Sequence, residues 1–202
     1  MKTGPKDLNI KEFFGTPLWI SETDVKDFNK YVDPYINGAK KSAKKEDVFY
    51  ETPSLLHDEN FANFVKYIQY TTRNLLDESG YDLNQYNIGI HEMWAREFVP
   101  EKGVSVFPHC HKDTHLTGIV ILKASKDTSQ PVFYDPRPGK YMKDLPEKKK
   151  GDFTLACDKF SINVKPGMFL IFPSFLSQGF SYTYTKNKFR YLHFTSSAIL
   201  RG

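Results

Sequence analysis

Three side chains with metal-binding chemistry stand close together near the middle of the chain, at His109, His111 and Asp113. Successive side chains of an extended segment alternate between two faces, so these three would share one face. Cys110 and Lys112 would then point to the other face. Two imidazoles and a carboxylate form a ligand set that suits Fe(II), Zn(II) and similar divalent ions. The spacing therefore indicates a metal site; the alternative is a pair of hydrogen-bonded polar residues in a strand.

The residues that follow would give this polar cluster a rigid support. Residues 116–122 form an apolar run rich in β-branched side chains, which is typical of a buried strand. His115 begins this run, and we expect it to pack or to form hydrogen bonds rather than to bind the metal. Gly103, with five residues between it and the His109-x-His111 pair, also fits the opening of a cupin signature. That signature has a later glutamate ligand, and this chain has His115 at about that place.

The second half of the chain has the pattern of a sheet-rich fold. Turn signals such as Lys165-Pro166-Gly167 separate short runs of apolar and aromatic residues. The predicted strands cover residues 86–94, 95–99, 104–109, 115–122, 132–134, 160–164, 168–172, 179–184 and 189–195. Eight or so strands without helices between them indicate an antiparallel sandwich or barrel, of which the double-sheet jelly roll is one solution.

The first part of the chain carries helical spacing instead. Apolar side chains predict a strong helix over residues 59–79, with Asp58 as its N-cap and Gly80 as the left-handed residue that ends it. A shorter helix is predicted over residues 22–31, with Ser21 as its cap. A strong helix before a run of strands usually lies across the outside of a sheet.

These elements predict a single domain over residues 1–202. We expect a loosely ordered start over residues 1–12, an N-terminal helical portion over residues 13–85 and a β core over residues 86–198. The helical portion would open with a short aromatic strand and would include a charged loop that ends near residue 48.

Composition and charge narrow the classes of function. Hydrophobic residues make up 40% and aromatic residues 15% of the chain, which is enough for a real core between layers. The formal charge is +4, with its excess in lysine runs at 40–45 and 148–150, which we expect to be solvated loops rather than nucleic-acid sites. Cys110 and Cys157 cannot form a disulfide framework, and no apolar run suggests a signal peptide or a membrane span. We expect a cytoplasmic protein, in the host cytoplasm if a phage encodes it.

Four segments in a fixed order resemble one known family. Residues 107–119, FPHCHKDTHLTGI, resemble the HxHxxxxxSG segment of the 2-oxoglutarate and Fe(II)-dependent oxygenases often encoded by bacteria and by tailed phages. Residues 132–138, VFYDPRP, are similar to the family's FxDPRP element, and residues 166–176, PGMFLIFPSFL, to its PGxLxLFPSWL element. Residues 13–19, FFGTPLW, resemble its FPTPIW start. The order of the four is more specific than any one of them.

This resemblance implies a fold, a cofactor and a set of site residues. It implies a double-stranded β-helix, a jelly roll whose open end holds Fe(II) and the cosubstrate 2-oxoglutarate. His109, His111 and Asp113 would bind the iron. Arg190 matches the family's arginine on the last strand and would hold the far carboxylate of 2-oxoglutarate, a role that suits a guanidinium.

The chain departs from the family pattern at two places. Where the family carries its distal histidine, this chain has Gln178, whose neutral amide is a weaker ligand that would complete or border the metal site. Leu192 stands where relatives have a small polar residue. His193 is another candidate for the distal ligand, but strand alternation makes it face opposite to Arg190, so both cannot point into the barrel.

Two functions from different classes fit these observations. The first is a hydroxylase-type oxygenase that depends on Fe(II) and 2-oxoglutarate and acts on an unknown substrate. The second is a jelly-roll protein that has kept the oxygenase shell, has lost the metal and serves as a structural or binding module, for instance in a phage particle. A cupin-type metal protein without 2-oxoglutarate is a third interpretation. The sequence leaves open a homo-oligomer or a virion partner.

Overall fold

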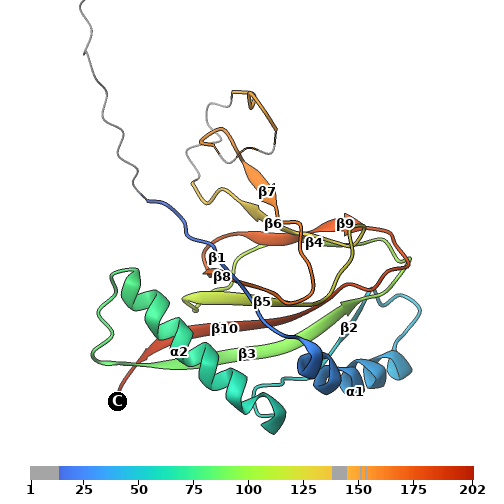
Figure 1. Cartoon of the computed structure of the whole chain (residues 1–202), viewed down its shortest axis with the longest axis horizontal. Helices are drawn as coiled ribbons and strands as arrows, with labels where there is room; N and C mark the ends of the chain where they lie inside the picture. The colour runs from blue at the N-terminus through green and yellow to red at the C-terminus, as the bar shows by residue number, and fades with distance from the viewer. Residues whose placement is uncertain (1–13, 138–144, 151, 153) are drawn as a thin grey trace, which may run out of the picture.

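Two antiparallel sheets dominate this chain (Figure 1). The computed structural model describes residues 14–137, 145–150, 152 and 154–202. The strands within these residues are β1 (Trp19–Glu22), β2 (Phe49–Glu51), β3 (Tyr86–Phe98), β4 (Val104–His109), β5 (Leu116–Lys123), β6 (Pro131–Tyr134), β7 (Lys159–Ser161), β8 (Met168–Pro173), β9 (Gln178–Thr183) and β10 (Arg190–Leu200). One sheet has the order β1-β8-β5-β10-β3-β2, and the other has the order β4-β9-β6-β7.

The two sheets enclose an apolar core. It combines side chains of the six-stranded sheet, such as Ile119 and Phe172, with side chains of the four-stranded sheet, such as Phe133 and Phe180. Each of these four is at most 4% exposed. Two antiparallel sheets packed face to face over such a core form a jelly roll, so the predicted mainly β fold is confirmed.

The two longest strands cross the middle of the six-stranded sheet side by side. β3 and β10 pair along their whole length, from Arg190 opposite Glu97 to Leu200 opposite Tyr86. A break in β3 between residues 94 and 95 and an end of β10 at residue 195 were predicted from the sequence, and both predictions are wrong. Continuous backbone pairing with its neighbour carries each strand past these points, with a single irregularity between Thr195 and Ser196.

The strong predicted helix is present. It consists of a single 3-10 turn, η1 (Glu59–Phe61), followed by α2 (Ala62–Glu78). The Asp58 carboxylate accepts a hydrogen bond from the Asn60 backbone N–H at 2.9 Å, as expected for an N-cap. Gly80 has a φ of 91°, the left-handed conformation that ends the helix.

The first helix is longer than its sequence pattern suggested. α1 (Lys26–Ser42) continues well beyond residue 31, over a segment that the sequence analysis assigned to a charged loop. Its buried Val32 and Ile36 explain the extension, because they continue the apolar face of the helix. The predicted cap Ser21 lies in β1 instead, and Val25 precedes the helix without a side-chain capping bond.

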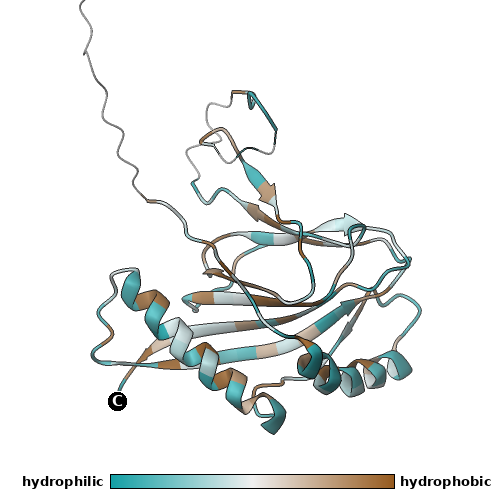
Figure 2. Cartoon of the chain, in the orientation of Figure 1, coloured by the Kyte–Doolittle hydropathy of each residue, from teal (hydrophilic) through white to brown (hydrophobic). Residues whose placement is uncertain are grey.

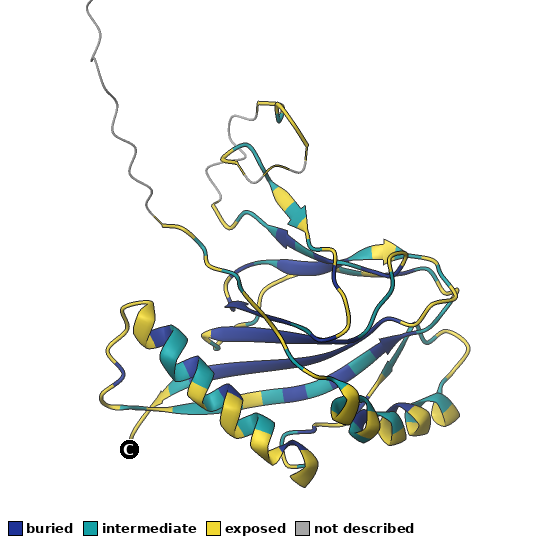
Figure 3. Cartoon of the chain, viewed as in Figure 1, coloured by how far each residue is buried: buried dark blue, intermediate teal, exposed yellow. Residues whose placement is uncertain are grey.

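Both helices pack on the face of the six-stranded sheet that is turned away from the four-stranded sheet (Figure 1). Val32 of α1 and Ile68 of α2 share one apolar cluster with Met93, Leu192 and Phe194 of the central strands. Figure 2 shows the mixed apolar and polar faces of the helices, and Figure 3 shows that their outward side is exposed while the central strands are buried. The central strands are therefore covered on both faces, and each face has its own set of side chains.

Gly118 of β5 shows how tightly the helix-side face is packed. A Cβ atom at this position would lie 2.0 Å from the Cζ atom of Phe194 on the neighbouring strand. No other residue fits there without moving that ring, which explains why a glycine follows the histidine segment at this spacing.

Some expectations fall outside the described residues. These are the loose start over residues 1–12 and the ends of two motifs, Phe13 and Pro138. Within the part of the chain that the structure describes, no helix is both long enough and apolar enough to cross a membrane.

Candidate metal centre

Glu92, His111 and His193 converge between the two sheets. Each offers one ligand atom, and these three atoms lie within 4.8 Å of one another. The Glu92 Oε1 atom is 3.7 Å from His111 Nδ1 and 3.8 Å from His193 Nδ1, while the Nε2 atoms of the two histidines are 3.2 Å apart. They come from β3, from the loop after β4 and from β10, so long-range folding alone brings them together.

Strand alternation and register place two members of the cluster. In the β3–β10 pair, Trp94 stands opposite His193, and Glu92 stands opposite Thr195. These four side chains belong to the face that looks toward the four-stranded sheet, because their neighbours, Met93 among them, belong to the helix-side cluster. The interior face of β3 and β10 therefore carries polar groups at one end of the sheet.

His111, the third member of the cluster, lies in a loop that hydrogen bonds hold in place. The backbone N–H of His111 donates to the carbonyl of Ser174 at 3.1 Å. The Ser174 hydroxyl is in turn 2.8 Å from the hydroxyls of both Thr114 and Thr117. Since Thr117 belongs to β5 and Ser174 follows β8, this hydroxyl network ties the His111 loop to the rigid central strands.

Trp94 orders the cluster from the side. Its ring stacks on the imidazole of His193, with 4.5 Å between centroids and an interplanar angle of 23°. Its indole N–H lies 3.3 Å from Glu92 Oε2, which leaves the Oε1 atom of the same carboxylate for the two histidines. Trp94 therefore restrains both a ligand ring and a ligand carboxylate.

The surroundings of the two histidines favour the neutral imidazole. Burial, together with the nearby His111, His109 and Arg96, lowers the pKa of His193 well below its usual value. Burial and His109 also lower the pKa of His111, although the Glu92 carboxylate opposes that shift. Neutral imidazoles expose nitrogen lone pairs, which is the form in which histidine binds metals.

A second polar pair lies beside the cluster. His109 Nε2 is 2.8 Å from Gln178 Nε2, because the β4–β9 register places the two residues opposite each other. Gln178 is only 2% exposed, and its Oε1 atom has no hydrogen-bond partner among the described residues. The His109 and His111 rings are 5.2 Å apart. The structure thus brings His109 and Gln178 together, next to the three-residue cluster and not within it.

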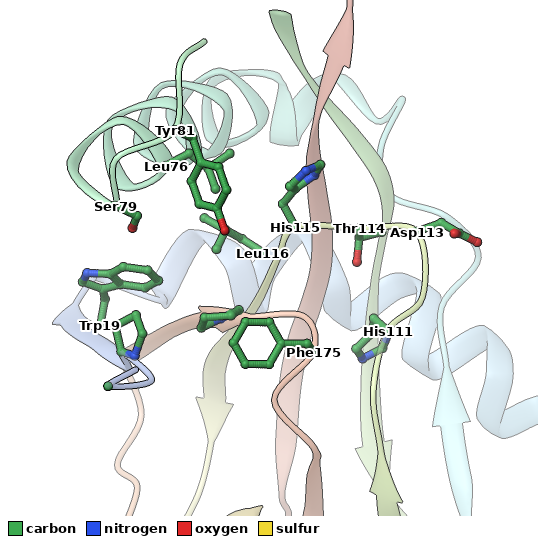
Figure 4. A pocket seen from close by; sticks show the side chains of 13 residues that line it. Trp19, Leu76, Ser79, Tyr81, His111, Asp113, Thr114, His115, Leu116 and Phe175 are labelled. Atoms are coloured by element: carbon green, nitrogen blue, oxygen red, sulfur yellow. The ribbon is translucent and has the colours of Figure 1, made fainter. Parts of the chain in front are cut away.

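Asp113 does not have the extended conformation that the sequence analysis assumed. β4 ends at His109, and Asp113 has a φ of 59°, in the left-handed region. Its side chain is exposed and points away from His111 (Figure 4). The alternation that would have aligned it with the histidines ends with the strand, so the structure does not bring Asp113 to them.

A cavity of about 480 Å³ opens beside His111 (Figure 4). Its walls come from the segment before and at the start of β1, from the end of α2 and the turn after it, and from the loops that follow β4 and β8. His111 is the member of the three-residue cluster that also lines this cavity.

The comparisons with known proteins agree with this architecture. Residues 92–188 match the model of the family described as "Putative 2OG-Fe(II) oxygenase". Just under half of the chain is thus similar in sequence to the 2OG-Fe(II) oxygenases. The matched range begins at Glu92 and ends two residues before Arg190. No curated protein matches the sequence significantly.

Solved structures of 2OG-Fe(II) oxygenases share the fold. An oxidoreductase of the 2OG-Fe(II) oxygenase family from Burkholderia pseudomallei gives a TM-score of 0.53 at 11% identity, covering 89% of this chain and 84% of its own. The 2OG complex of a viral collagen prolyl hydroxylase from Paramecium bursaria Chlorella virus-1 gives 0.50 at 15% identity, covering 90% and 96%. A prolyl-4-hydroxylase from Pseudomonas putida gives 0.53 at 10% identity, covering 92% and 93%.

The residues of the cluster fit the metal that a 2OG-Fe(II) oxygenase implies. Two imidazoles and one carboxylate are the donor set of the facial triad that binds non-haem Fe(II). Three buried side-chain atoms lack a hydrogen-bond partner among the described residues, and one of them is the Nδ1 atom of His193 within the cluster. The other two are Gln178 Oε1, beside the cluster, and Thr195 Oγ1, opposite Glu92. Unpaired buried polar atoms are costly, so their concentration here is what a ligand-binding site would show.

The family's arginine is not part of this centre. Arg190 lies on the helix-side face of β10, and only 1% of its side chain is exposed. It donates to Glu97 at 2.9 Å and to Asp33 of α1 at 2.6 Å. The resemblance predicted that Arg190 would face the histidines. The structure corrects this orientation, because Glu97 stands directly opposite Arg190 in the β3–β10 register and pairs with it.

Of the three cluster residues, Glu92 was not predicted from the sequence, and His193 was considered as the distal ligand and set aside. Glu92 drew no attention, although it alternates with Met93 and shares a strand face with Trp94. His193 was recognised as facing opposite to Arg190, but the family resemblance placed Arg190 inside. The signal that could have reversed this choice is the apolar pair Leu192 and Phe194, which shares a face with Arg190 and needs a helix layer to cover it.

Proposed function

We propose that this chain is an active, hydroxylase-type 2OG-Fe(II) oxygenase whose iron is held by Glu92, His111 and His193. The observation that carries the proposal is the convergence of these three ligand atoms, together with the unpartnered buried Nδ1 atom of His193. His109 and Gln178 border the site and are assigned no ligand role. Asp113 is likewise assigned no ligand role, because its exposed side chain is turned outward.

The chain's own residues would prepare the site for this chemistry. When bound, iron and 2-oxoglutarate supply the activation of O2, with oxidative decarboxylation of the cosubstrate and oxidation of a substrate C–H bond. Glu92 contributes the negative charge of the ligand set, and Trp94 fixes the direction of that carboxylate. The Ser174 hydroxyl network holds the His111 loop in place. These hydrogen bonds would hold the ligand side chains in position before a metal binds.

The cosubstrate needs a cation for its far carboxylate, and Arg96 is our candidate. It belongs to β3, on the same face as Glu92 and Trp94, and stands opposite Tyr191. Its guanidinium lies 4.6 Å from the Trp94 ring centroid and donates to the half-exposed Glu51 at 2.7 Å. An ion pair at the solvent edge exchanges partners at little cost, whereas Arg190 would have to leave a fully buried one. Arg96 is therefore better placed than Arg190 to receive an incoming carboxylate.

The alternative of a module without metal is not favoured. A chain that had lost its metal site would not be expected to keep two neutral imidazoles and a carboxylate in convergence, with the buried Nδ1 atom of His193 left without a hydrogen-bond partner among the described residues. The suggestion of a phage particle has no support among the comparisons. Two of the similar structures are prolyl hydroxylases by name, so a peptidyl proline is one substrate to test first.

Anaerobic metal binding tests the proposal. Wild-type protein is expected to bind about one equivalent of Fe(II) and, with 2-oxoglutarate and O2, to form succinate. Glu92→Gln and His193→Leu are expected to lose both properties. His91→Gln is the matched control, because His91 is an exposed histidine one residue from Glu92. A wild type that binds no Fe(II), or a Glu92→Gln variant that binds it unchanged, would overturn the assignment.

The cosubstrate anchor is tested separately on zinc-loaded protein, where no turnover occurs. Titration calorimetry is expected to show that Arg96→Met weakens 2-oxoglutarate binding at least tenfold, about 1.4 kcal/mol. Unchanged binding in Arg96→Met would remove Arg96 from the proposal and leave the metal assignment standing.

A further inference from the structure

The cavity beside His111 has walls that are fixed by backbone hydrogen bonds. Trp19 is held by its place opposite Ile171 in the β1–β8 pair. The left-handed conformation of Gly80 turns the chain so that Tyr81 lies at the cavity. The Tyr81 backbone N–H donates to the Leu76 carbonyl at 3.1 Å. The cavity is therefore formed before any ligand binds, and its volume of about 480 Å³ falls in the range of about 300–1,000 Å³ typical of ligand pockets.

The lining of this cavity is mostly apolar. Leu76 and Leu116 are nearly completely buried around it, and the aromatic rings of Trp19 and Phe175 form further walls. Phe175 is 60% exposed, so part of its ring is available to a ligand. Figure 4 shows these groups around a common space, with the Tyr81 hydroxyl directed toward it. The surface would gain most by covering a hydrocarbon or ring group.

The charges around the cavity exclude the cosubstrate as its occupant. No lysine, arginine or glutamate is among its lining residues within the described part of the chain. The single carboxylate, Asp113, points outward (Figure 4). The far carboxylate of 2-oxoglutarate would lose its hydration there without gaining a counter-charge from a lysine or arginine of the lining. An uncharged apolar group would lose nothing comparable.

We propose that this cavity is the substrate subsite and that it takes an uncharged apolar group, an aliphatic or ring group of the molecule to be oxidised. The inference rests on the proposed function, because His111 would then be both a metal ligand and part of the subsite wall. A group in the cavity would lie alongside His111, which is where a C–H bond must be presented. The aromatic rim and the absence of cationic residues select against anionic substrates at this position.

Fluorine NMR of protein labelled with 5-fluorotryptophan tests the inference. The chain has two tryptophans, Trp19 in the cavity wall and Trp94 beside the metal cluster, so Trp19→Phe and Trp94→Phe assign the two resonances. Cyclohexanol and cyclohexanecarboxylate serve as uncharged and charged probes of similar size. Cyclohexanol is expected to shift the Trp19 resonance saturably and to bind at least tenfold more tightly than the carboxylate.

Two variants make the result specific. Phe175→Ala removes an exposed wall residue and is expected to weaken cyclohexanol binding about fivefold, an effect of about 1 kcal/mol. Tyr182→Ala removes an aromatic residue of similar exposure, 68%, that does not line the cavity, and it is expected to bind like wild type. Equal binding of both probes, no response of Trp19, or unchanged binding in Phe175→Ala would each overturn the inference.

The same spectra separate this inference from the metal proposal. Zn(II) is expected to move the Trp94 resonance, whether or not cyclohexanol is present. A Trp19 response without a Trp94 response would refute the metal assignment and leave the apolar cavity supported. A Trp94 response without a Trp19 response would refute the cavity assignment alone.

Discussion

The two faces of β10 bury polar groups in opposite ways. On the helix side, the charged atoms of Arg190 meet Glu97 and Asp33, and Lys40 completes the Glu97 carboxylate at 2.6 Å. On the interior side, burial lowers the pKa of His193, and its Nδ1 atom has no hydrogen-bond partner among the described residues. The charged groups on the helix side are therefore all paired with one another. The His193 nitrogen on the interior side is left for a partner from outside the protein, such as a metal. The structural role of Arg190 and the proposed metal-binding role of His193 thus lie on opposite faces of one strand, three residues apart.

The largest expected effect comes from removing the ion pairs of Arg190 on the helix side of β10. Arg190→Met leaves the buried Glu97 carboxylate with Lys40 as its remaining cation, and we expect a loss of about 3–5 kcal/mol in the free energy of unfolding. Chemical denaturation of metal-free protein measures it. His193→Leu is the comparison on the other face and should cost much less, because it removes no charged pair. Equal losses would show that the two faces do not differ in this way.

The next largest effect is expected on metal affinity, from a change at His193 on the interior face of β10. His193→Leu removes one of three ligands, and we expect metal affinity to fall roughly 100-fold or more, beyond the about 10–100-fold typical of changes around a ligand. Competition against a zinc-sensitive dye measures the affinity. His57→Leu, at an exposed histidine in a loop, is the control and should bind like wild type. An affinity within threefold of wild type in His193→Leu would contradict the role of His193.

Acid should weaken the helix-side network. Burial alone would raise the pKa of Glu97, but Lys40 and Arg190 outweigh burial and hold it below its usual value. A carboxyl group with a lowered pKa contributes stability that is complete above its unfolded pKa and is lost as the pH falls through the folded pKa. The unfolding free energy should therefore decline as the pH falls below about 4.5, and less steeply in Glu97→Gln. Parallel curves for the two proteins would contradict this account.

A smaller effect on metal affinity is expected from Trp94, which contacts both His193 and Glu92. Trp94→Phe keeps an aromatic ring beside His193 but removes the N–H that approaches Glu92. Metal affinity should fall about fivefold, in line with the about 1 kcal/mol of one hydrogen bond. The same dye competition checks it. A loss as large as that of His193→Leu would mean that Trp94 does more than orient the carboxylate.

The smallest effect is expected beside the cluster. Gln178→His introduces the histidine that the family resemblance led us to expect there, yet Gln178 contacts His109 and lies outside the three-residue cluster. Metal affinity should change less than about threefold, or about 0.7 kcal/mol. A tenfold rise would place the metal between His109 and residue 178 instead.

Much of the fold followed from local sequence patterns. The buried run at residues 116–122, the cap at Asp58 and the left-handed Gly80 are decided by nearby residues, and each was predicted correctly. The extension of α1 past residue 31 was missed, because Pro34 interrupts the helical pattern there and the burial of Val32 and Ile36 depends on the sheet that the helix covers.

The site was only partly predictable, for a reason that lies in strand geometry. Alternation shows that Arg190 and His193 face opposite ways, but it does not show which face is the interior. That choice is made by the helix layer over Leu192 and Phe194 and by Glu97 opposite Arg190. Glu92 is 19 residues from His111 and 101 from His193 in sequence, so only the paired strands reveal their proximity.

The most direct test of the central claim is a crystal structure of protein soaked anaerobically with Fe(II), with anomalous scattering recorded at the iron edge. We predict one strong anomalous peak at about 2.0–2.2 Å from ligand atoms of Glu92, His111 and His193. A peak bound by His109 and Gln178 without Glu92 and His193, or no peak from protein that remains folded, would contradict the account.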